Sequence, residues 1–202
     1  MVLRMADADV LPYQYTDLAE TVRGYVKEVE TLATTLRTEQ KEQNDEIEAG
    51  VYKAMADPKK PVVAPLAKPL PPYLNFGALD QAADDLTVAA AAYDKALMAS
   101  HDPTQTAALD TELMQTDRAQ LDPAGLPHRP WFQNMLYAPG FYTGYGVKTL
   151  PAAREAIEQK DWPTAEDGIT RTAAAIEREA DALKKATAML SPGSSPTTAA
   201  GN

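Results

Sequence analysis

The residues that decide the fold are PTAEDGITRTAAAIEREADALKKATAML, at positions 163–190. Apolar and small residues recur in this stretch at alternating steps of four and three, which places them along one face of an α-helix. Such a seam is typical of a helix that packs in an antiparallel bundle. We therefore predict a long helix that begins near Pro163. Its seam consists of Ile169, Ala173, Ile176, Ala180, Leu183, Thr187 and Leu190.

A second seam of this kind lies near the start of the chain. It predicts a helix that begins close to Asp17, with Glu20 at the spacing of a capping-box partner. Residues 37–46 are wholly polar, so we expect them to form either a solvated helix extension or the tip of a hairpin. The apolar stripe of this helix is Tyr15, Leu18, Val22, Tyr25, Val29, Leu32 and Leu36.

Proline recurs through residues 58–74. Because proline lacks the backbone donor and cannot continue a helix, this stretch is predicted to be an extended connector. A polyproline ligand for a recognition domain is the alternative interpretation. A further helix is expected after Asn75, with a buried stripe of Leu79, Leu86, Tyr93 and Leu97 and small neighbours Ala82, Ala83, Ala89 and Ala90.

A third helix is predicted from Asp102-Pro103, where Asp102 is placed to cap the helix and Gln105 to complete a capping box. It is expected to end at Asp122-Pro123 and to bury Leu109, Leu113 and Leu121. No segment shows a convincing period-two alternation bounded by turns. The predicted fold class is therefore all-α, an antiparallel four-helix-type bundle with a long Pro/Gly/aromatic loop at 122–149 before the last two helices.

The two ends of the chain differ from its middle. Val2, Leu3, Met5 and Ala6 resemble the last turns of an apolar helix that Leu11-Pro12 then stops. We therefore expect residues 1–14 to be the end of a preceding domain, residues 15–190 to be the helical domain, and the chain to begin inside a larger protein. Residues 191–202 are small, polar and Pro/Gly-bearing, so a disordered tail is predicted there.

The composition excludes several classes of function. The net charge is −10 and the pI is near 4.7, whereas nucleic-acid binding depends on an excess of Lys and Arg. No apolar run approaches the roughly 18 residues that cross a membrane, and we expect no signal peptide after Met1. There are no cysteines, which removes disulfides and thiolate metal sites but indicates no compartment.

The residues needed for catalysis are scarce as well. The two histidines, His101 and His128, lack the Glu-x-x-His and His-Glu-x-x-His spacings of metal sites in helical proteins. His101 is expected to be exposed beside a helix cap, and His128, between two prolines, to be structural or exposed. Neither a glycine-rich phosphate loop nor a serine with a base at a recognisable spacing is present. We therefore predict no catalytic residue, no metal ligand and no cofactor in this chain.

The loop at 122–149 is the one segment whose composition suggests a function. It concentrates aromatic residues among prolines and glycines, and a loop of this length in a compact domain is commonly functional or packed against another body. Simple capping of the bundle by these rings is the alternative. The aromatic residues are Trp131, Phe132, Tyr137, Phe141, Tyr142 and Tyr145.

Two strings in and after this loop carry a family resemblance. LDPAGLPHRPWFQNMLYAP at 121–139 and GYGVKTLPAAREAIEQKDW at 144–162 resemble the C-terminal segment of the glutamate carboxypeptidase II and transferrin receptor family. LRMADADVLPYQYTDLA at 3–19 is similar to that family's junction between peptidase domain and helical domain. The resemblance spans residues 2–188. It is weak from Thr38 to Pro72, and we interpret this stretch as an insertion relative to the family.

The resemblance implies a transferrin receptor-like dimerisation domain. Such a domain packs on its own peptidase domain, contacts a second subunit in a homodimer, and completes the substrate pocket of a zinc-dependent exopeptidase without being catalytic itself. The zinc is then held by the peptidase domain, outside this chain. The implied parent protein is secreted, periplasmic or membrane-anchored. The alternative is a receptor-like or stand-alone helical interaction module without peptidase activity, because the transferrin receptor branch has lost catalysis.

The resemblance also implies the residues that bind substrate. In the family, a Lys-Tyr pair in the loop binds the carboxylates of a C-terminal glutamate. The tyrosine of this pair falls on Tyr145, whereas the lysine falls on Gly144, which puts specificity for glutamate in doubt. Lys148 is close in sequence and is a candidate to supply the cation.

Overall fold

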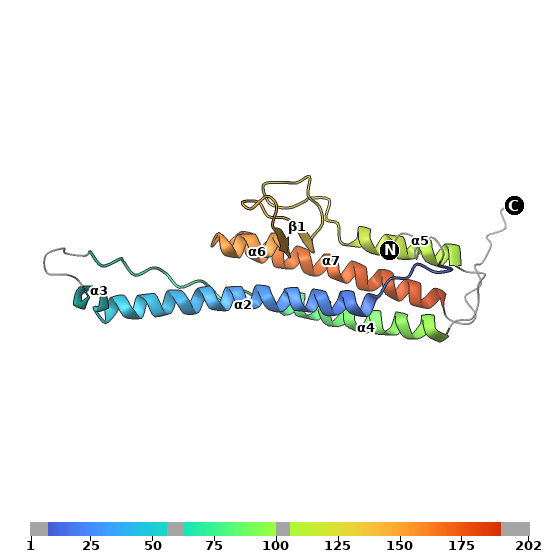
Figure 1. Ribbon diagram of the computed structural model, residues 1–202, viewed down its shortest axis with the longest axis horizontal. Coiled ribbons are helices and arrows are strands. Elements are labelled where there is room, and N and C mark those ends of the chain that lie inside the picture. Colours follow the sequence, from blue (N-terminus) through green and yellow to red (C-terminus); the bar gives the residue numbers. More distant parts are fainter. Residues whose placement is uncertain (1–7, 56–62, 100–105, 191–202) are drawn as a thin grey trace.

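The computed structural model describes residues 8–55, 63–99 and 106–190. Long helices lie side by side in an elongated bundle (Figure 1), which confirms the all-α class. The expected tail at 191–202, the expected cap at Asp102 and His101 lie outside the described residues. The elements are α2 (Tyr15–Glu48), α3 (Val51–Ala54), α4 (Gly77–Ala99), α5 (Thr106–Ala119), β1 (Tyr137–Pro139), β2 (Val147–Thr149), α6 (Pro151–Glu158) and α7 (Trp162–Met189).

The helices α4 and α7 form the centre of the bundle. Helix α7 packs against α4, α5 and α6, while α2 packs against α4 and α6. Figure 1 shows that α2 and α5 run in one direction and α4 and α7 in the other. The pairs α2/α4 and α5/α7 are therefore antiparallel, whereas α4 and α7 lie parallel. A seam of threes and fours does not specify the direction of its partner, so this parallel pair was not foreseen.

The predicted apolar stripes form the core. The α7 seam is buried from Ile169 to Leu183 and becomes half-buried at Thr187 and Leu190. Small residues let the helices approach closely: a Cβ added to Gly168 of α7 would lie 2.6 Å from the backbone carbonyl carbon of Ala152 in α6. The interior of α4 is buried as predicted, through Leu79, Ala82, Ala83, Leu86, Ala89, Ala90 and Tyr93, with Leu97 half-buried.

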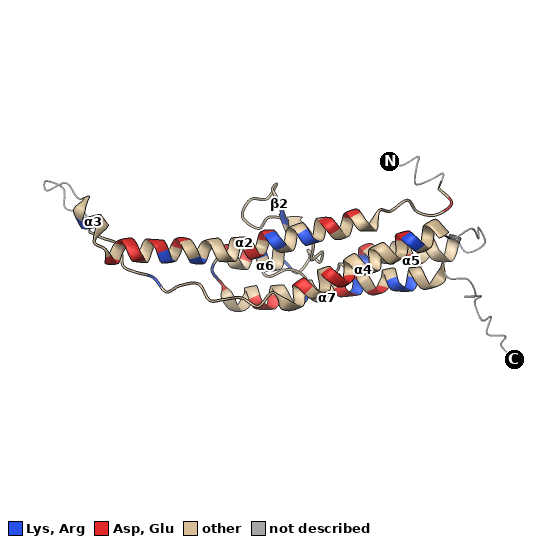
Figure 2. Cartoon of the chain, turned by 90° about the horizontal axis from the view of Figure 1, so that it is seen from below, with Lys and Arg blue, Asp and Glu red and all other residues tan. Residues whose placement is uncertain are grey.

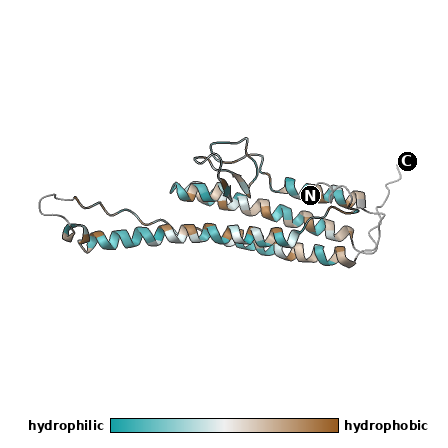
Figure 3. Cartoon of the chain, in the orientation of Figure 1, coloured by the Kyte–Doolittle hydropathy of each residue, from teal (hydrophilic) through white to brown (hydrophobic). Residues whose placement is uncertain are grey.

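Helix α2 is longer than its apolar stripe. It runs unbroken for 34 residues, so residues 37–46 form a helix extension that projects beyond the bundle (Figure 1) and is mainly hydrophilic (Figure 3). The capping box expected at Asp17 and Glu20 is wrong, because the helix begins at Tyr15 and its N-cap, Gln14, makes no side-chain bond. Burial of the Tyr15 ring in the core explains this earlier start.

The Pro-rich connector is extended in its described part, residues 63–74, and returns along the projecting end of α2 (Figure 1). The side chain of Asn44 pairs with the backbone of Lys68, donating to its carbonyl at 2.7 Å and accepting from its amide at 3.0 Å. The guanidinium of Arg37 donates to the carbonyl of Pro71 and lies 3.9 Å from the ring centroid of Tyr73. These contacts fix the path of the chain into α4.

The loop at 122–149 contains a small β-hairpin that the sequence did not predict. Strands β1 and β2 have three residues each, too short to show a period-two pattern, and pair antiparallel with Ala138 opposite Lys148. Helix α5 ends at Ala119, so Leu121, expected to be buried, is 37% exposed and bridges to Asn134 instead. No helix in the described ranges is both long and apolar enough to span a membrane.

Candidate functional site

The tip of the hairpin, residues 140–146, carries the tyrosine that the sequence singled out. The turn is closed by backbone bonds from Gly140 N to Gly146 O, 2.7 Å, and from Gly144 N to Gly140 O, 2.9 Å. Gly144 has a φ of +64°, a conformation that glycine adopts readily. The side chain of Tyr145 is fully exposed, at 103% of its reference area. The fold therefore presents this phenol to the surroundings from a bonded turn.

The other two residues implied in substrate binding lie in different settings. Gly144 stands beside Tyr145, and a Cβ added there would meet nothing within 4 Å. Lys148 lies in β2, and its Nζ donates to both carboxylate oxygens of Glu158 in α6, at 2.6 and 2.9 Å. Its ammonium is therefore already paired, and it would have to leave Glu158 to meet a substrate carboxylate.

Aromatic side chains cover the outside of this loop. Trp131 and Tyr142 are 72% and 76% exposed, and Tyr137 and Phe141 are each more than 40% exposed. Phe132 instead turns inward onto a small second core. Exposed aromatic groups gathered on one loop are typical of interaction surfaces. The second core consists of Leu126, Met135, Ala138, Ala152 and Ala175.

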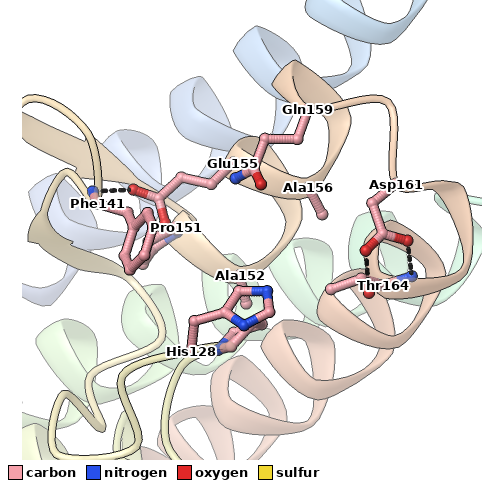
Figure 4. A pocket seen from close by; sticks show the side chains of 10 residues that line it. His128, Phe141, Pro151, Ala152, Glu155, Ala156, Gln159, Asp161 and Thr164 are labelled. Atoms are coloured by element: carbon pink, nitrogen blue, oxygen red, sulfur yellow. Dashed lines mark hydrogen bonds between the residues drawn. The ribbon is translucent and has the colours of Figure 1, made fainter.

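A buried ion pair lies beneath the loop and was not foreseen. Arg129 Nη2 donates to Glu155 Oε2 at 2.6 Å, with 3% and 12% of the two side chains exposed. The other carboxylate oxygen, Oε1, accepts from the amide of Phe141 at 2.8 Å (Figure 4). Arg129 also donates to the carbonyl of Pro139. The resemblance strings contain both charged residues, but a pairing across 26 positions leaves no local signal.

Two arginines of α7 hold the beginning of the loop. Arg171 donates from Nε to Asp122 Oδ2 at 2.7 Å and also to the carbonyl of Gly125. The hydrogen bond from Arg171 lowers the pKa of the Asp122 carboxyl. Arg178 donates to the carbonyls of Ala119 and Leu121, at 3.1 and 2.9 Å, and so satisfies backbone groups left open where α5 ends.

A chain of side-chain amides connects the bundle core to β1. Glu179 Oε1 accepts from Gln120 Nε2 at 3.1 Å, and Gln120 Oε1 accepts from Asn134 Nδ2 at 3.1 Å. Asn134 Oδ1 then accepts from the amides of Leu136 and Tyr137, at 2.8 and 3.0 Å. In these bonds the side-chain nitrogens donate and the side-chain oxygens accept, and together they tie the root of the hairpin to α7.

A narrow cleft lies between the loop and the start of α7 (Figure 4). Its volume of about 20 Å³ is enough for roughly one water molecule. Its carboxylates are already used, since Asp161 accepts from Thr164 at the start of α7. His128 borders the cleft with a φ of +61° and is exposed, as expected from the sequence. The cleft is too small for a substrate.

The described ranges contain no grouping of three or more His, Asp or Glu side chains that could hold a metal ion. Acidic and basic residues are both spread along the helices, with the acidic ones in excess (Figure 2). The part of the chain that the structure describes thus offers a presented tyrosine, a buried ion pair and an aromatic surface, and these features suit binding.

Comparisons with known proteins identify relatives among probable glutamate carboxypeptidases. The chain is 24% identical over 191 residues to a probable glutamate carboxypeptidase of Arabidopsis thaliana, covering 91% of this chain and 23% of that protein. It is 33% identical over 91 residues to a probable glutamate carboxypeptidase of Arthroderma benhamiae, covering 45% of this chain and 12% of that protein. The chain thus spans about a quarter or less of the length of these relatives.

The profile of one domain family matches more than half of the chain. It covers residues 74–184, from the end of the connector through α4, α5, the loop, the hairpin and α6 into the last turns of α7. All of α2 and α3 and the connector up to residue 73 lie outside the match. The chain belongs to the transferrin receptor-like dimerisation domain family.

Proposed function

We propose that this chain is the dimerisation and substrate-pocket-completing domain of a zinc-dependent exopeptidase similar to glutamate carboxypeptidases, and that it is not catalytic alone. The observation that carries this proposal is Tyr145, a fully exposed phenol on a bonded hairpin turn. The names of the two relatives support the class of parent enzyme. The family description supports a homodimer.

In this proposal, zinc binding and catalysis belong to a separate peptidase domain, and this chain contributes only to the substrate pocket. Zinc requires three or four nitrogen, oxygen or sulfur ligands from the protein, and the described residues contain no such group. The metal and the reacting groups are therefore assigned to a peptidase domain elsewhere in a longer protein, called the parent below. The aromatic surface of the loop packs on that domain, and this packing brings the hairpin tip to the pocket.

Within that pocket, the Tyr145 hydroxyl donates a hydrogen bond to a carboxylate of the substrate's C-terminal residue. A hydrogen bond to a charged group is worth about 1.5–3 kcal/mol. Gly144 supplies no cation, and Lys148 is held by Glu158. The parent should therefore bind a free C-terminal carboxylate but show little preference for a C-terminal glutamate.

The test is a panel of peptides that differ only in their C-terminal residue, assayed on the parent enzyme. Tyr145→Phe should lower kcat/KM by about ten- to a hundred-fold. The matched control is Tyr142→Phe, which removes an exposed hydroxyl from the same turn, one bonded at 3.4 Å to Gln159. Unchanged kinetics in Tyr145→Phe, or a parent with no peptidase activity, would overturn the proposal.

Gly144→Lys tests the missing cation. The site has open space, but its φ of +64° imposes a strain of about 1 kcal/mol on any side chain. Gly144→Ala carries the same strain without the ammonium and is therefore the control. We expect Gly144→Lys, and not Gly144→Ala, to raise the preference for glutamate. A wild-type parent that already prefers glutamate strongly would contradict the assigned role of Gly144.

A further inference from the structure

We infer that Glu155 is a positioning residue: it sets the conformation of the hairpin tip and thereby the substrate selectivity of the pocket that the tip completes. The inference rests on the proposed function for its substrate and on the geometry of the loop for its mechanism. Glu155 lies in α6, outside the hairpin, and its carboxylate points toward the backbone amide of Phe141 (Figure 4).

The side chains of the Arg129–Glu155 ion pair form hydrogen bonds to the backbone on both sides of Gly140. Arg129 donates to the carbonyl of Pro139, the residue before this glycine. Glu155 Oε1 accepts from the amide of Phe141, the residue after it, at 2.8 Å. The chain that leaves β1 is therefore hydrogen-bonded through the carbonyl of Pro139, before Gly140, and through the amide of Phe141, after it. This arrangement fixes the direction in which the tip begins.

The tip beyond Gly140 is exposed, but backbone hydrogen bonds connect it to the start of the turn. A Cβ added to Gly140 would lie 2.2 Å from Thr143 Oγ1, which shows how closely the turn folds on itself. The amide of Gly144 bonds back to Gly140, and that of Tyr145 to the carbonyl of Thr143 at 2.7 Å. A shift at residue 141 is therefore passed through these bonds to the exposed phenol of Tyr145.

Because the Arg129–Glu155 pair is buried, its loss should disturb the loop strongly. Arg129 is 3% exposed, and its Nε has no partner among the described residues. Its guanidinium lies 5.4 Å from the ring centroid of Phe132 and 5.9 Å from that of Phe141, so these neighbours offer aromatic rings and no second carboxylate. Removing the charge of Glu155 leaves a buried cation uncompensated, which is far more disruptive than breaking an exposed pair.

The chain provides a matched control on the same helix. Glu158, one turn beyond Glu155, binds Lys148 of β2 and so also joins α6 to the hairpin. The Lys148 and Glu158 side chains are 25% and 34% exposed, and neither bonds to the turn at 140–146 in the described structure. Glu158→Gln therefore removes an ion pair between the same two elements without removing the contact that we propose to be decisive.

The first experiment measures amide hydrogen exchange in the 202-residue chain. In Glu155→Gln the new amide group turns a donor toward Arg129, and we expect the amides of residues 141–146 to exchange about tenfold faster. Glu155→Asp, which keeps the charge on a shorter side chain, should show a smaller increase. Glu158→Gln should remain within about twofold of wild type, and α7 amides should be unchanged in all three. Equal exchange of residues 141–146 in Glu155→Gln and wild type would overturn the inference.

The second experiment assays the same variants in the parent, with peptides varied at the C-terminal residue. Glu155→Gln should raise KM several-fold and alter the order of preference among these peptides, with little change in kcat. Because Glu158→Gln frees Lys148, the kinetic control is Asp181→Asn, which removes an exposed ion pair of α7 and should match wild type. If Tyr145→Phe alters the kinetics and Glu155→Gln does not, the positioning role is wrong. If neither variant alters them, the proposed function of the tip is what fails.

Discussion

Glu179 of α7 is fully buried and accepts a hydrogen bond of 3.1 Å from Gln120, which follows the end of α5. Its second carboxylate oxygen has no partner in the described part of the chain. Burial raises the pKa of this carboxyl to about 7, the bond from Gln120 opposes the rise, and the charge of Asp117 adds to it. The bundle therefore holds an acid that is more easily protonated in the folded chain than in the unfolded chain.

This pKa predicts how stability depends on pH. In the unfolded chain the carboxyl titrates near 4.5, and in the folded chain near 7. Between these values unfolding releases a proton, so the free energy of unfolding falls as pH rises, by an amount on the order of 3 kcal/mol in total. Urea unfolding at pH 5 and at pH 7.5 measures this difference.

The variant that tests the assignment is Glu179→Gln, which has no proton to release. We expect most of the loss of stability between pH 5 and 7.5 to disappear in it. Glu177→Gln, on the exposed side of the same helix, serves as control and should keep the wild-type dependence. An equal dependence on pH in Glu179→Gln and wild type would contradict the prediction.

Replacing two helical glycines, Gly24 and Gly168, by alanine should change the free energy of unfolding in opposite directions. Gly24 of α2 is exposed, and an added Cβ meets nothing within 4 Å, so Gly24→Ala should raise the free energy of unfolding by about 0.5–1 kcal/mol. At Gly168 the same Cβ would lie 2.6 Å from the backbone of Ala152, so Gly168→Ala must push α6 from α7. We expect a loss of about 1–3 kcal/mol there. Thermal or urea unfolding checks both signs.

The contact of Arg171 with Asp122 predicts an acid-sensitive contribution. Because the folded-state pKa of Asp122 is below its ordinary value of 3.8, the contribution is present above that value and is lost as pH falls through the folded pKa. Asp122→Asn should cost about 1–2 kcal/mol at pH 7. The difference from wild type should shrink as pH falls below 3.8 and through the folded pKa.

The control for this prediction is Asp181→Asn. Asp181 pairs with Lys184 at the surface, with the two side chains 65% and 57% exposed, so its loss should change stability by less than about 0.5 kcal/mol. Urea unfolding at pH 7 compares the two variants. A cost for Asp122→Asn no larger than that for Asp181→Asn would show that the start of the loop is not held by this pair.

The 202-residue chain is predicted to bind no zinc. It has two histidines and no cysteine, and no metal-ligand grouping occurs within residues 8–55, 63–99 and 106–190. After treatment with a chelator and dialysis against zinc, metal analysis should find far less than one ion per chain, and the melting temperature should not rise with added zinc. Stoichiometric retention would contradict this.

Much of the bundle could be predicted because burial repeats along a helix. The stripes of α2, α4 and α7 were visible as spacings of three and four, and these residues form or line the core. The start of α2 and the end of α5 could not be placed, since burial of Tyr15 and the arginine contacts beyond Ala119 are tertiary effects.

The candidate site was less accessible to sequence analysis. Tyr145 and Gly144 were found only through a resemblance, and their roles in binding stay predictions. The ion pair of Arg129 and Glu155 joins residues on either side of a hairpin whose strands have three residues each. Nothing periodic connects two such residues, so the contact on which the tip depends becomes visible only in three dimensions.

The parallel course of α4 and α7 has an electrostatic consequence. It brings two helix N-termini to one end of the bundle, where the amide of Asn75, just before α4, donates to Glu166 of α7 at 3.4 Å. Each N-terminus carries a partial positive charge of about half a unit, and the two repel. Asp80 in the first turn of α4, Asp161 at the cap of α7, and Glu166 between the two helices offset this charge. At this end of an acidic protein, negative side chains therefore hold the helices together.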